Sequence, residues 1–240
     1  WRGEATVTGE LSPLNLSATG RAVGQDVKAP GEPLAPIEMT WRGGADTKGA
    51  WARTDPFELL GGMWVLRAAY AGEQTLGSLN ISLTEVPLGA VAKVAGAPID
   101  LGGVLTAEVD VAAPGLDLTQ LSLSGAWSVE RPIADRFGVE RGRGRIRTRR
   151  GRVDFTDILL ELGEGQVVGS VGFNLSEPQR LDVELTSRRW PVQIEGTPVG
   201  VLVDAAVDLE LDVVERWARG RVDLTAPVLV QDEPYGELAI

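Results

Sequence analysis

The chain has 240 residues, of which 43% are hydrophobic and 24% charged, and it carries a formal net charge of −11. It contains no cysteine and no histidine, which excludes disulfides, thiolate metal sites, cysteine nucleophiles, the Ser-His-Asp triad and histidine-based zinc sites. The negative charge argues against nucleic acid as a partner, because binding to phosphates needs a net basic surface.

The apolar residues alternate with polar ones along most of the chain, as in a strand with one face in contact with water. On this pattern we expect strands, in chain order, at residues 5–11, 14–18, 37–41, 64–70, 79–83, 104–111, 116–129, 139–148, 153–162, 167–175, 181–186, 192–194, 201–213, 219–224 and 228–230. Short turn sequences at 163–165 and 176–179 favour antiparallel neighbours.

Helical signals are few. Residues 87–95 predict two helical turns that begin at Pro87 and place Leu88, Val91 and Val94 on one side. Weaker helical signals lie at 57–60 and 133–137, and the Gly- and Pro-rich segment 20–36 is expected to be a surface loop. So few helices cannot cover such a sheet, so its apolar face must pack against itself as a sandwich or barrel, or face a ligand.

Five arginines occupy every second position from Arg141 to Arg149. If this segment is a strand, the guanidinium groups of Arg141, Arg143, Arg145, Arg147 and Arg149 project from one face. The favoured interpretation is a solvated outer face, paired across strands with carboxylates such as Asp154, Asp157, Glu161 and Glu164. The alternative is a contact surface for anionic lipid headgroups or for a protein partner.

No motif predicts catalysis or a cofactor. The acids Asp204, Asp208, Glu210 and Asp212 alternate with apolar residues, which indicates the wet side of a strand more than a catalytic pair or calcium site. The glycine pairs at 142–144 and 163–165 do not continue into a phosphate-binding loop, and Ser124 lacks a nucleophile-elbow motif. We therefore expect no enzymatic activity, no metal and no cofactor.

The sequence from Val139 to Leu185 has a repeating form: an Arg-rich strand, a turn at 150–152, VDFTDILLEL, GEG, VVGSVGFNL and LDVEL. Residues 82–91 and 101–110 add a short Val-Pro-Leu helix followed by a hairpin that begins with glycines, and Ser187-Arg-Arg-Trp190-Pro-Val fits less specifically. This form resembles the repeat of the AsmA/TamB-like family over residues 65–230. The resemblance implies a twisted antiparallel sheet curled lengthwise into an open, taco-like groove with one or two short helices.

Members of that family are thought to carry phospholipid acyl chains between the inner and outer membranes of diderm bacteria. The resemblance therefore implies a periplasmic segment that contributes to outer-membrane biogenesis, that is anchored to the inner membrane through sequence absent here, and that in some members acts with a partner of the outer-membrane insertase class. We expect the 240 residues to belong to a longer chain, with a β segment at 1–60 that hardly carries the resemblance and a continuous groove segment at 61–240.

We expect one face of the strands to line the groove and to solvate acyl chains without covalent chemistry. Its residues are Leu105, Ala107, Val109, Val111, Val153, Phe155, Ile158, Leu160, Leu162, Val167, Val171, Phe173, Leu181, Val183, Val207, Leu209 and Leu211. Three alternatives stay open: a structural or adhesive β-sandwich or β-solenoid module with a filled core, a transmembrane barrel, and a carbohydrate-active β enzyme.

Overall fold

The structure is a computed structural model that describes residues 1–25, 27, 33–71, 76–95, 101–114, 122–134, 137–149, 151–193, 200–212 and 214–230. Over these residues the fold is all-β and antiparallel with one short helix, as the sequence predicts. Internal contacts divide the chain into unit 1, Trp1–Pro98 with Val104–Gly125, and unit 2, Ile99–Gly103 with Ala126–Ile240.

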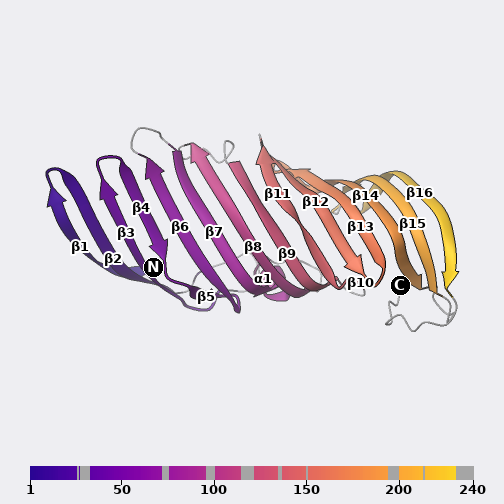
Figure 1. The fold of residues 1–240 in the computed structure, drawn as a ribbon, viewed down its shortest axis with the longest axis horizontal. Helices are drawn as coiled ribbons and strands as arrows, with labels where there is room; N and C mark the ends of the chain where they lie inside the picture. Colours follow the sequence, from indigo (N-terminus) through magenta and orange to yellow (C-terminus); the bar gives the residue numbers. More distant parts are fainter. Residues whose placement is uncertain are drawn as a thin grey trace. The chain divides into compact units, whose positions relative to one another are not determined.

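Unit 1 is an antiparallel meander in which neighbouring strands follow one another along the chain, except that the short β5 lies off the main order (Figure 1). Its elements are β1 (Arg2–Leu11), β2 (Leu14–Gly24), β3 (Ile37–Asp46), β4 (Gly49–Thr54), β5 (Phe57–Leu59), β6 (Gly62–Ala71), β7 (Leu76–Pro87), α1 (Leu88–Ala95) and most of β8 (Leu101–Pro114). The strand order is β1-β2-β3-β4-β6-β7-β8, and β5 pairs with β6. Within the described residues β1 has one neighbour, so this sheet does not close on itself.

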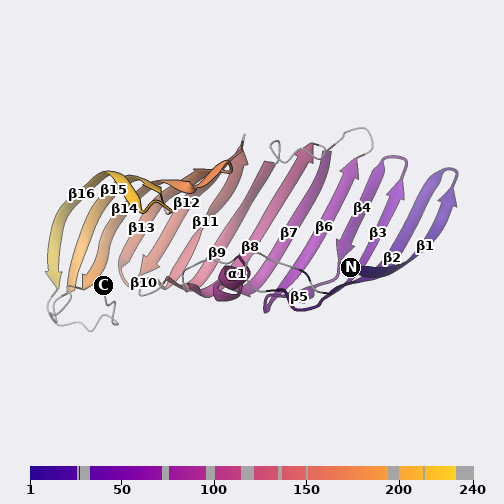
Figure 2. The ribbon, with the colours of Figure 1, turned by 180° about the vertical axis from the view of Figure 1, so that it is seen from behind.

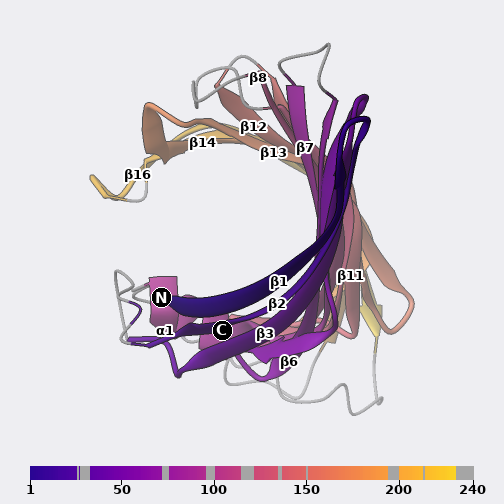
Figure 3. The ribbon, with the colours of Figure 1, turned by 90° about the vertical axis from the view of Figure 1, so that its left-hand side faces the viewer.

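Unit 2 repeats the same construction. Its strands are most of β9 (Ser122–Ala134), β10 (Phe137–Gly138), β11 (Arg141–Arg149), β12 (Arg152–Leu162), β13 (Gly165–Asn174), β14 (Glu177–Gln193), β15 (Gly200–Asp212) and β16 (Trp217–Val230). The order is β9-β11-β12-β13-β14-β15-β16, with β10 against β9, and the described part of β16 pairs only with β15. The described strands of unit 2, like those of unit 1, do not close on themselves. Figure 3 shows that β1–β3 of unit 1 bend along their length, as do β12–β14 of unit 2.

Cross-strand register gives each unit one apolar and one polar face. In unit 1, Ile81 on β7 lies opposite Leu66 on β6 and Val109 on β8. In unit 2, Val183 on β14 lies opposite Val171 on β13 and Leu209 on β15. Because directly paired residues share a face of the sheet, the alternation in each strand builds a continuous apolar surface across the unit.

Several strands keep this register by means of a bulge, among them β7, β12 and β14. The pairing shifts between Leu83 and Val86 in β7, between Phe155 and Ile158 in β12, and between Ser187 and Trp190 in β14. Within these three shifts, Glu85, Asp157 and Arg189 have φ values of 55°, 53° and 48°. The extra residue returns the apolar residues that follow it to the face they would otherwise leave.

The apolar face of unit 1 is covered at one end by α1. Figure 2 shows the helix in front of the sheet, near the ends of β7 and β8. Val86 at the end of β7 is fully buried, and Ile37, Phe57 and Ala92 are at most 6% exposed. The helix predicted at 87–95 is confirmed at Leu88–Ala95. Its residue Ala92 belongs to the small buried core of this unit.

Two weaker helix predictions were wrong. Phe57–Leu59 is the strand β5, which forms a tight hairpin with β6 through Leu60 and Gly61, at φ values of 58° and 78°. Positive φ at both turn residues is the geometry of a type I′ hairpin, and cross-strand pairing then overrides the helical spacing. The described part of 133–137 likewise lies in β9 and β10, which pair with each other.

Several strand boundaries also differ from the sequence predictions. Strand β4 was missed because Gly49–Thr54 shows little alternation, and β2 continues to Gly24 into the expected loop. Segments 181–186 and 192–194 belong to one strand, β14, whose bulge interrupts the pattern, and 219–224 and 228–230 form the single strand β16. The predicted strand positions 116–121, 194 and 213 and the loop positions 26 and 28–32 lie outside the described residues.

Candidate functional site

The predicted groove residues of unit 1 lie together on the apolar face. Leu105, Ala107, Val109 and Val111 on β8 pair with Val86, Leu83, Ile81 and Leu79 on β7. All four are partly exposed, whereas Thr106, Glu108 and Asp110 between them are exposed on the other face. Along β2 the apolar-face residues are partly exposed in the same way. This surface is therefore apolar and accessible.

The predicted groove residues of unit 2 also share one face, which the register shows directly. Val153 pairs with Phe173, Phe155 with Val171, and Leu160 with Val167. From β13 the same face continues through Leu181 and Val183 to Leu211 and Leu209, and Val207 is opposite Leu185. After the bulge in β12, Ile158 pairs with Gly169 on β13 and Leu162 pairs with Gly165. The structure thus brings together all thirteen residues predicted here in unit 2.

In the part of the chain that the structure describes, neither apolar face is covered by a second layer within its unit. Among the described residues, nine hydrophobic side chains are buried, and Val86, next to α1, is the one of these that is fully buried. The predicted groove residues are partly exposed in both units, except for Val153 and Ile158, which are buried. An apolar face that stays accessible in this way is what a ligand-binding surface requires.

A tryptophan forms part of the apolar face in unit 2. The Trp127 ring lies edge-to-face on Phe155, with ring centroids 6.5 Å apart. It lies so close to Gly142 and Gly144 that a Cβ at Gly144 would stand 2.7 Å from its ring. Its indole Nε1 is buried and has no hydrogen-bond partner among the described residues. Sequence reasoning missed this cluster, although the two glycines alternate with arginines on β11.

Two hollows in unit 1 show where its surface is concave. One, of about 600 Å³, lies between α1, the β5–β6 turn and residues 33–36, and has Lys93 and Glu58 among apolar neighbours. The other, of about 380 Å³, lies over β2, β3, β4 and β6, where Leu16, Ala45, Ala50 and Tyr70 contribute to its lining. Both volumes are in the range of small-molecule pockets.

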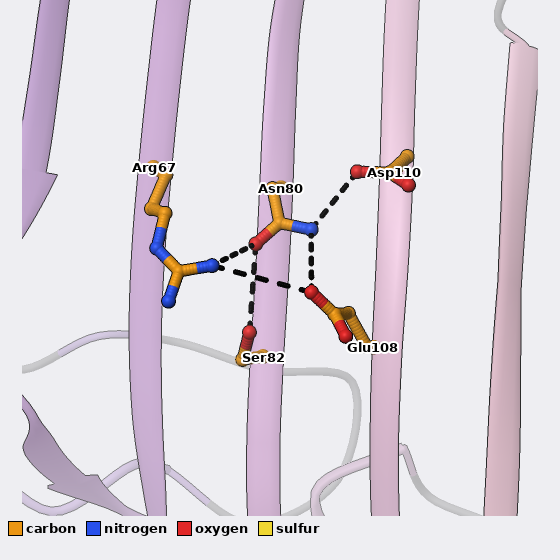
Figure 4. Close-up of polar contacts among 5 residues, drawn as sticks. All are labelled: Arg67, Asn80, Ser82, Glu108 and Asp110. Carbon is orange, nitrogen blue, oxygen red and sulfur yellow. Dashed lines mark hydrogen bonds and ion pairs between the residues drawn. The ribbon is translucent and has the colours of Figure 1, made fainter.

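The opposite face of unit 1 carries cross-strand polar contacts (Figure 4). Arg67 on β6 donates to the Asn80 side-chain oxygen on β7 at 3.1 Å, and the Asn80 amide donates to Asp110 on β8 at 2.9 Å. Glu108 accepts a longer bond from Asn80, at 3.3 Å. These exposed groups satisfy one another across three strands, which identifies this side as the solvated face.

The arginine ladder, Arg141 to Arg149 on β11, lies on the polar face of unit 2. All five side chains are exposed, whereas Gly142, Gly144, Ile146 and Thr148 between them are partly or fully buried. Pairing with carboxylates, the favoured interpretation, is present at Arg145, whose Nε is 3.6 Å from Asp157. Within the described residues the other four form no ion pair: Asp154 pairs with Arg152, and Glu164 pairs with Arg189.

Arg152 is the centre of the ion-pair network beside the ladder. Its guanidinium contacts Asp154 on its own strand and Asp182 on β14, each at 2.7 Å. It reaches β14 by lying over Gly172 on β13, a position where a Cβ would collide with it. The hydrogen bond to Asp182, followed by that to Asp154, raises the pKa of Arg152 above its ordinary value.

The alternating acids of β15 have structural partners. Asp204 accepts the Arg189 backbone N–H at 2.6 Å, and the nearly buried Asp212 accepts the N–H groups of Val214 and Glu215. Asp208 and Glu210 lie opposite Arg221 and Arg219. Within the described ranges no cluster of potential metal ligands is found, and no helix has the length and apolarity to cross a bilayer.

Comparisons of the chain with protein-family models, curated proteins and solved structures find no match.

Proposed function

We propose that this chain is a lipid-binding segment that holds phospholipid acyl chains against the apolar face of each unit. The observation that carries the proposal is the accessible apolar face in each unit, which cross-strand register maintains and which, among the described residues, is covered at one end of unit 1 alone. Burial of acyl chains there contributes about 0.8 kcal/mol per CH₂ removed from water. No covalent chemistry is involved.

The resemblance to the AsmA/TamB-like family extends this proposal to a biological setting. There the segment would conduct phospholipids between the inner and outer membranes of a diderm bacterium during envelope biogenesis. It would act in the periplasm, as part of a longer chain anchored to the inner membrane, with an insertase-class protein as a partner. The open antiparallel sheet with one short helix supports this extension at the level of fold.

A structural or adhesive module is the competing function. A sandwich or solenoid would have a dry core between facing layers. Neither unit, in its described part, contains a second sheet over the apolar face, and the residues of that face are mostly half-exposed. These observations favour a surface that binds a ligand over one that only supports a shape.

Two variants on the same strand test the proposal. Val171 lies on the apolar face of β13, and Val168 is 45% exposed on the opposite face. The chain is expressed in a diderm host, washed free of detergent, and analysed by native mass spectrometry with lipid extraction. We expect bound phospholipid in the wild type and in Val168→Asp, and its loss in Val171→Asp and in Leu209→Asp.

The alternative outcome is equally clear. A wild-type chain that is lipid-free, monodisperse and cooperative in thermal unfolding would mean that its apolar faces need no ligand, and the structural-module interpretation would replace ours. Equal loss of lipid in Val168→Asp and Val171→Asp would show that the lipid does not distinguish the two faces.

A further inference from the structure

We propose that the arginine ladder of β11 binds an extended acidic peptide segment of a partner protein, one with Asp or Glu at every second residue. The ladder lies on the polar face, so the sheet itself separates it from lipid on the apolar face of unit 2. This binding surface is independent of the lipid-binding function.

The spacing of the ladder is regular. The pairing of β11 with β12 shifts between Arg143 and Arg145, but the extra residue belongs to β12, where Asp157 has φ = 53°. Strand β11 alternates without interruption between exposed arginines and partly or fully buried residues. Five guanidinium groups therefore recur at about 6.6 Å over roughly 26 Å. An extended peptide has the same rise per residue, so alternate carboxylates match this spacing.

Four of the five arginines keep their charge available. Among the described residues, Arg141, Arg143, Arg147 and Arg149 form no ion pair. Arg147 lies opposite Asp154, but that carboxylate is held by Arg152, and Arg149 lies opposite Arg152 itself. The end of β11 at Arg147 and Arg149 is thus a site of uncompensated positive charge in a chain of net charge −11.

The neighbouring charges favour a linear ligand over a flat anionic surface. On the β12 side the ladder is bordered by Asp154, Asp157 and Glu161. A bilayer of anionic headgroups would bring negative charge against these carboxylates, whereas a single peptide strand can follow the arginines. More distant acids are screened over about 8 Å at physiological salt. Arginine and carboxylate then pair in bidentate fashion.

The test compares two peptides of identical composition by isothermal titration calorimetry with the full 240-residue chain at 0.15 M salt. One alternates Asp and Thr over ten residues, and the other has five Asp followed by five Thr. We expect the alternating peptide to bind about tenfold more tightly, because only it matches the ladder along its length. Equal affinities would show attraction by charge alone and would overturn the proposal.

Matched variants locate the site. Arg147→Gln/Arg149→Gln removes two charges from the ladder, and Arg219→Gln/Arg221→Gln removes two from alternate positions of β16 that lie opposite carboxylates. We expect roughly tenfold weaker binding in the first variant and less than about twofold in the second. Similar losses in both would contradict a specific site.

Two further arms separate the remaining explanations. Arg147→Lys/Arg149→Lys keeps the charge but not the planar fork, so we expect an intermediate affinity for the alternating peptide; wild-type affinity would argue against bidentate pairing.

Vesicles of phosphatidylglycerol serve as the membrane probe. Binding to these vesicles that depends on Arg147 and Arg149, with no binding of the alternating peptide, would assign the ladder to a lipid surface. Thermal unfolding of each variant confirms that it is folded.

Discussion

At the residue scale, the fold depends on a few glycine positions where a Cβ atom would have no room. Gly62 at the start of β6 packs on Val86, the one large side chain that is fully buried among the described residues. A Cβ at Gly62 would stand 2.6 Å from Val86 Cγ2 and 2.7 Å from its Cα. Because one of these atoms belongs to the backbone, no side-chain rotation relieves the contact.

Gly62→Ala is therefore expected to lower the free energy of unfolding by about 1–3 kcal/mol, the usual effect of overpacking. Gly77→Ala on β7 is the control, since its Cβ would meet its nearest neighbour, the Ala69 oxygen, at 4.0 Å. We expect a change below about 0.5 kcal/mol there. Urea unfolding followed by circular dichroism measures both, and equal effects would contradict the packing argument.

A second prediction at this scale concerns Gly172, which lets Arg152 cross β13 to Asp182. Gly172→Val should displace Arg152 and break its contact with β14. Loss of this ion pair should lower the free energy of unfolding by about 1 kcal/mol at most, because the pair is partly exposed and screened by solvent. A double-mutant cycle with Asp182→Asn checks this: the cost of Asp182→Asn should vanish in the Gly172→Val background.

At the element scale, the bulges decide which face each strand presents. In β12 the apolar positions are two apart up to Phe155, and the next is three residues on, at Ile158. Asp157 takes up the extra residue at positive φ. Without it, every apolar residue of the second half of the strand would turn to the polar face.

Deletion of Asp157 is therefore expected to destabilise unit 2 by more than about 2 kcal/mol, because the nearly buried Ile158 and its neighbours Leu160 and Leu162 would become exposed on the polar face. Asp157→Gly is the matched variant, since glycine adopts this φ without strain and keeps the residue count. It should retain near wild-type stability in thermal unfolding. A deletion variant as stable as Asp157→Gly would show that β12 tolerates either register.

At the scale of the whole molecule, the amount of apolar surface left accessible determines the heat-capacity change on unfolding. A compact protein of 240 residues has a heat-capacity change on unfolding of roughly 3–3.6 kcal/mol/K. Because this term follows the apolar area exposed on unfolding, a chain with uncovered apolar faces has less to expose.

Differential scanning calorimetry of the delipidated chain should therefore give a heat-capacity change below about 3 kcal/mol/K. Addition of phospholipid should raise the Tm, since a ligand that binds only the folded state stabilises it. A value within the compact range for the lipid-free chain, together with a Tm that lipid does not change, would mean that the apolar faces are already buried.

The sequence by itself determined the all-β class, most strands, the helix at 88–95 and the grouping of apolar residues, because strand alternation and helix signals are local properties of the chain. The tertiary structure decided what depends on neighbours distant in sequence: the hairpin that makes Phe57–Leu59 a strand, the bulge at Asp157, and the contact of Trp127 with Gly142 and Gly144. The gap of three between Phe155 and Ile158 was a visible sign of the bulge.

The arginine ladder shows the same division. Its alternation predicted five side chains on one exposed face, and this is what β11 presents. Which carboxylates pair with them was decided by register and by competition, since Arg152 holds Asp154 and Asp182 while Arg189 holds Glu164. Local pattern specifies the direction of a side chain relative to its strand, but its partners depend on which strands the fold brings alongside and on which other charges reach them first.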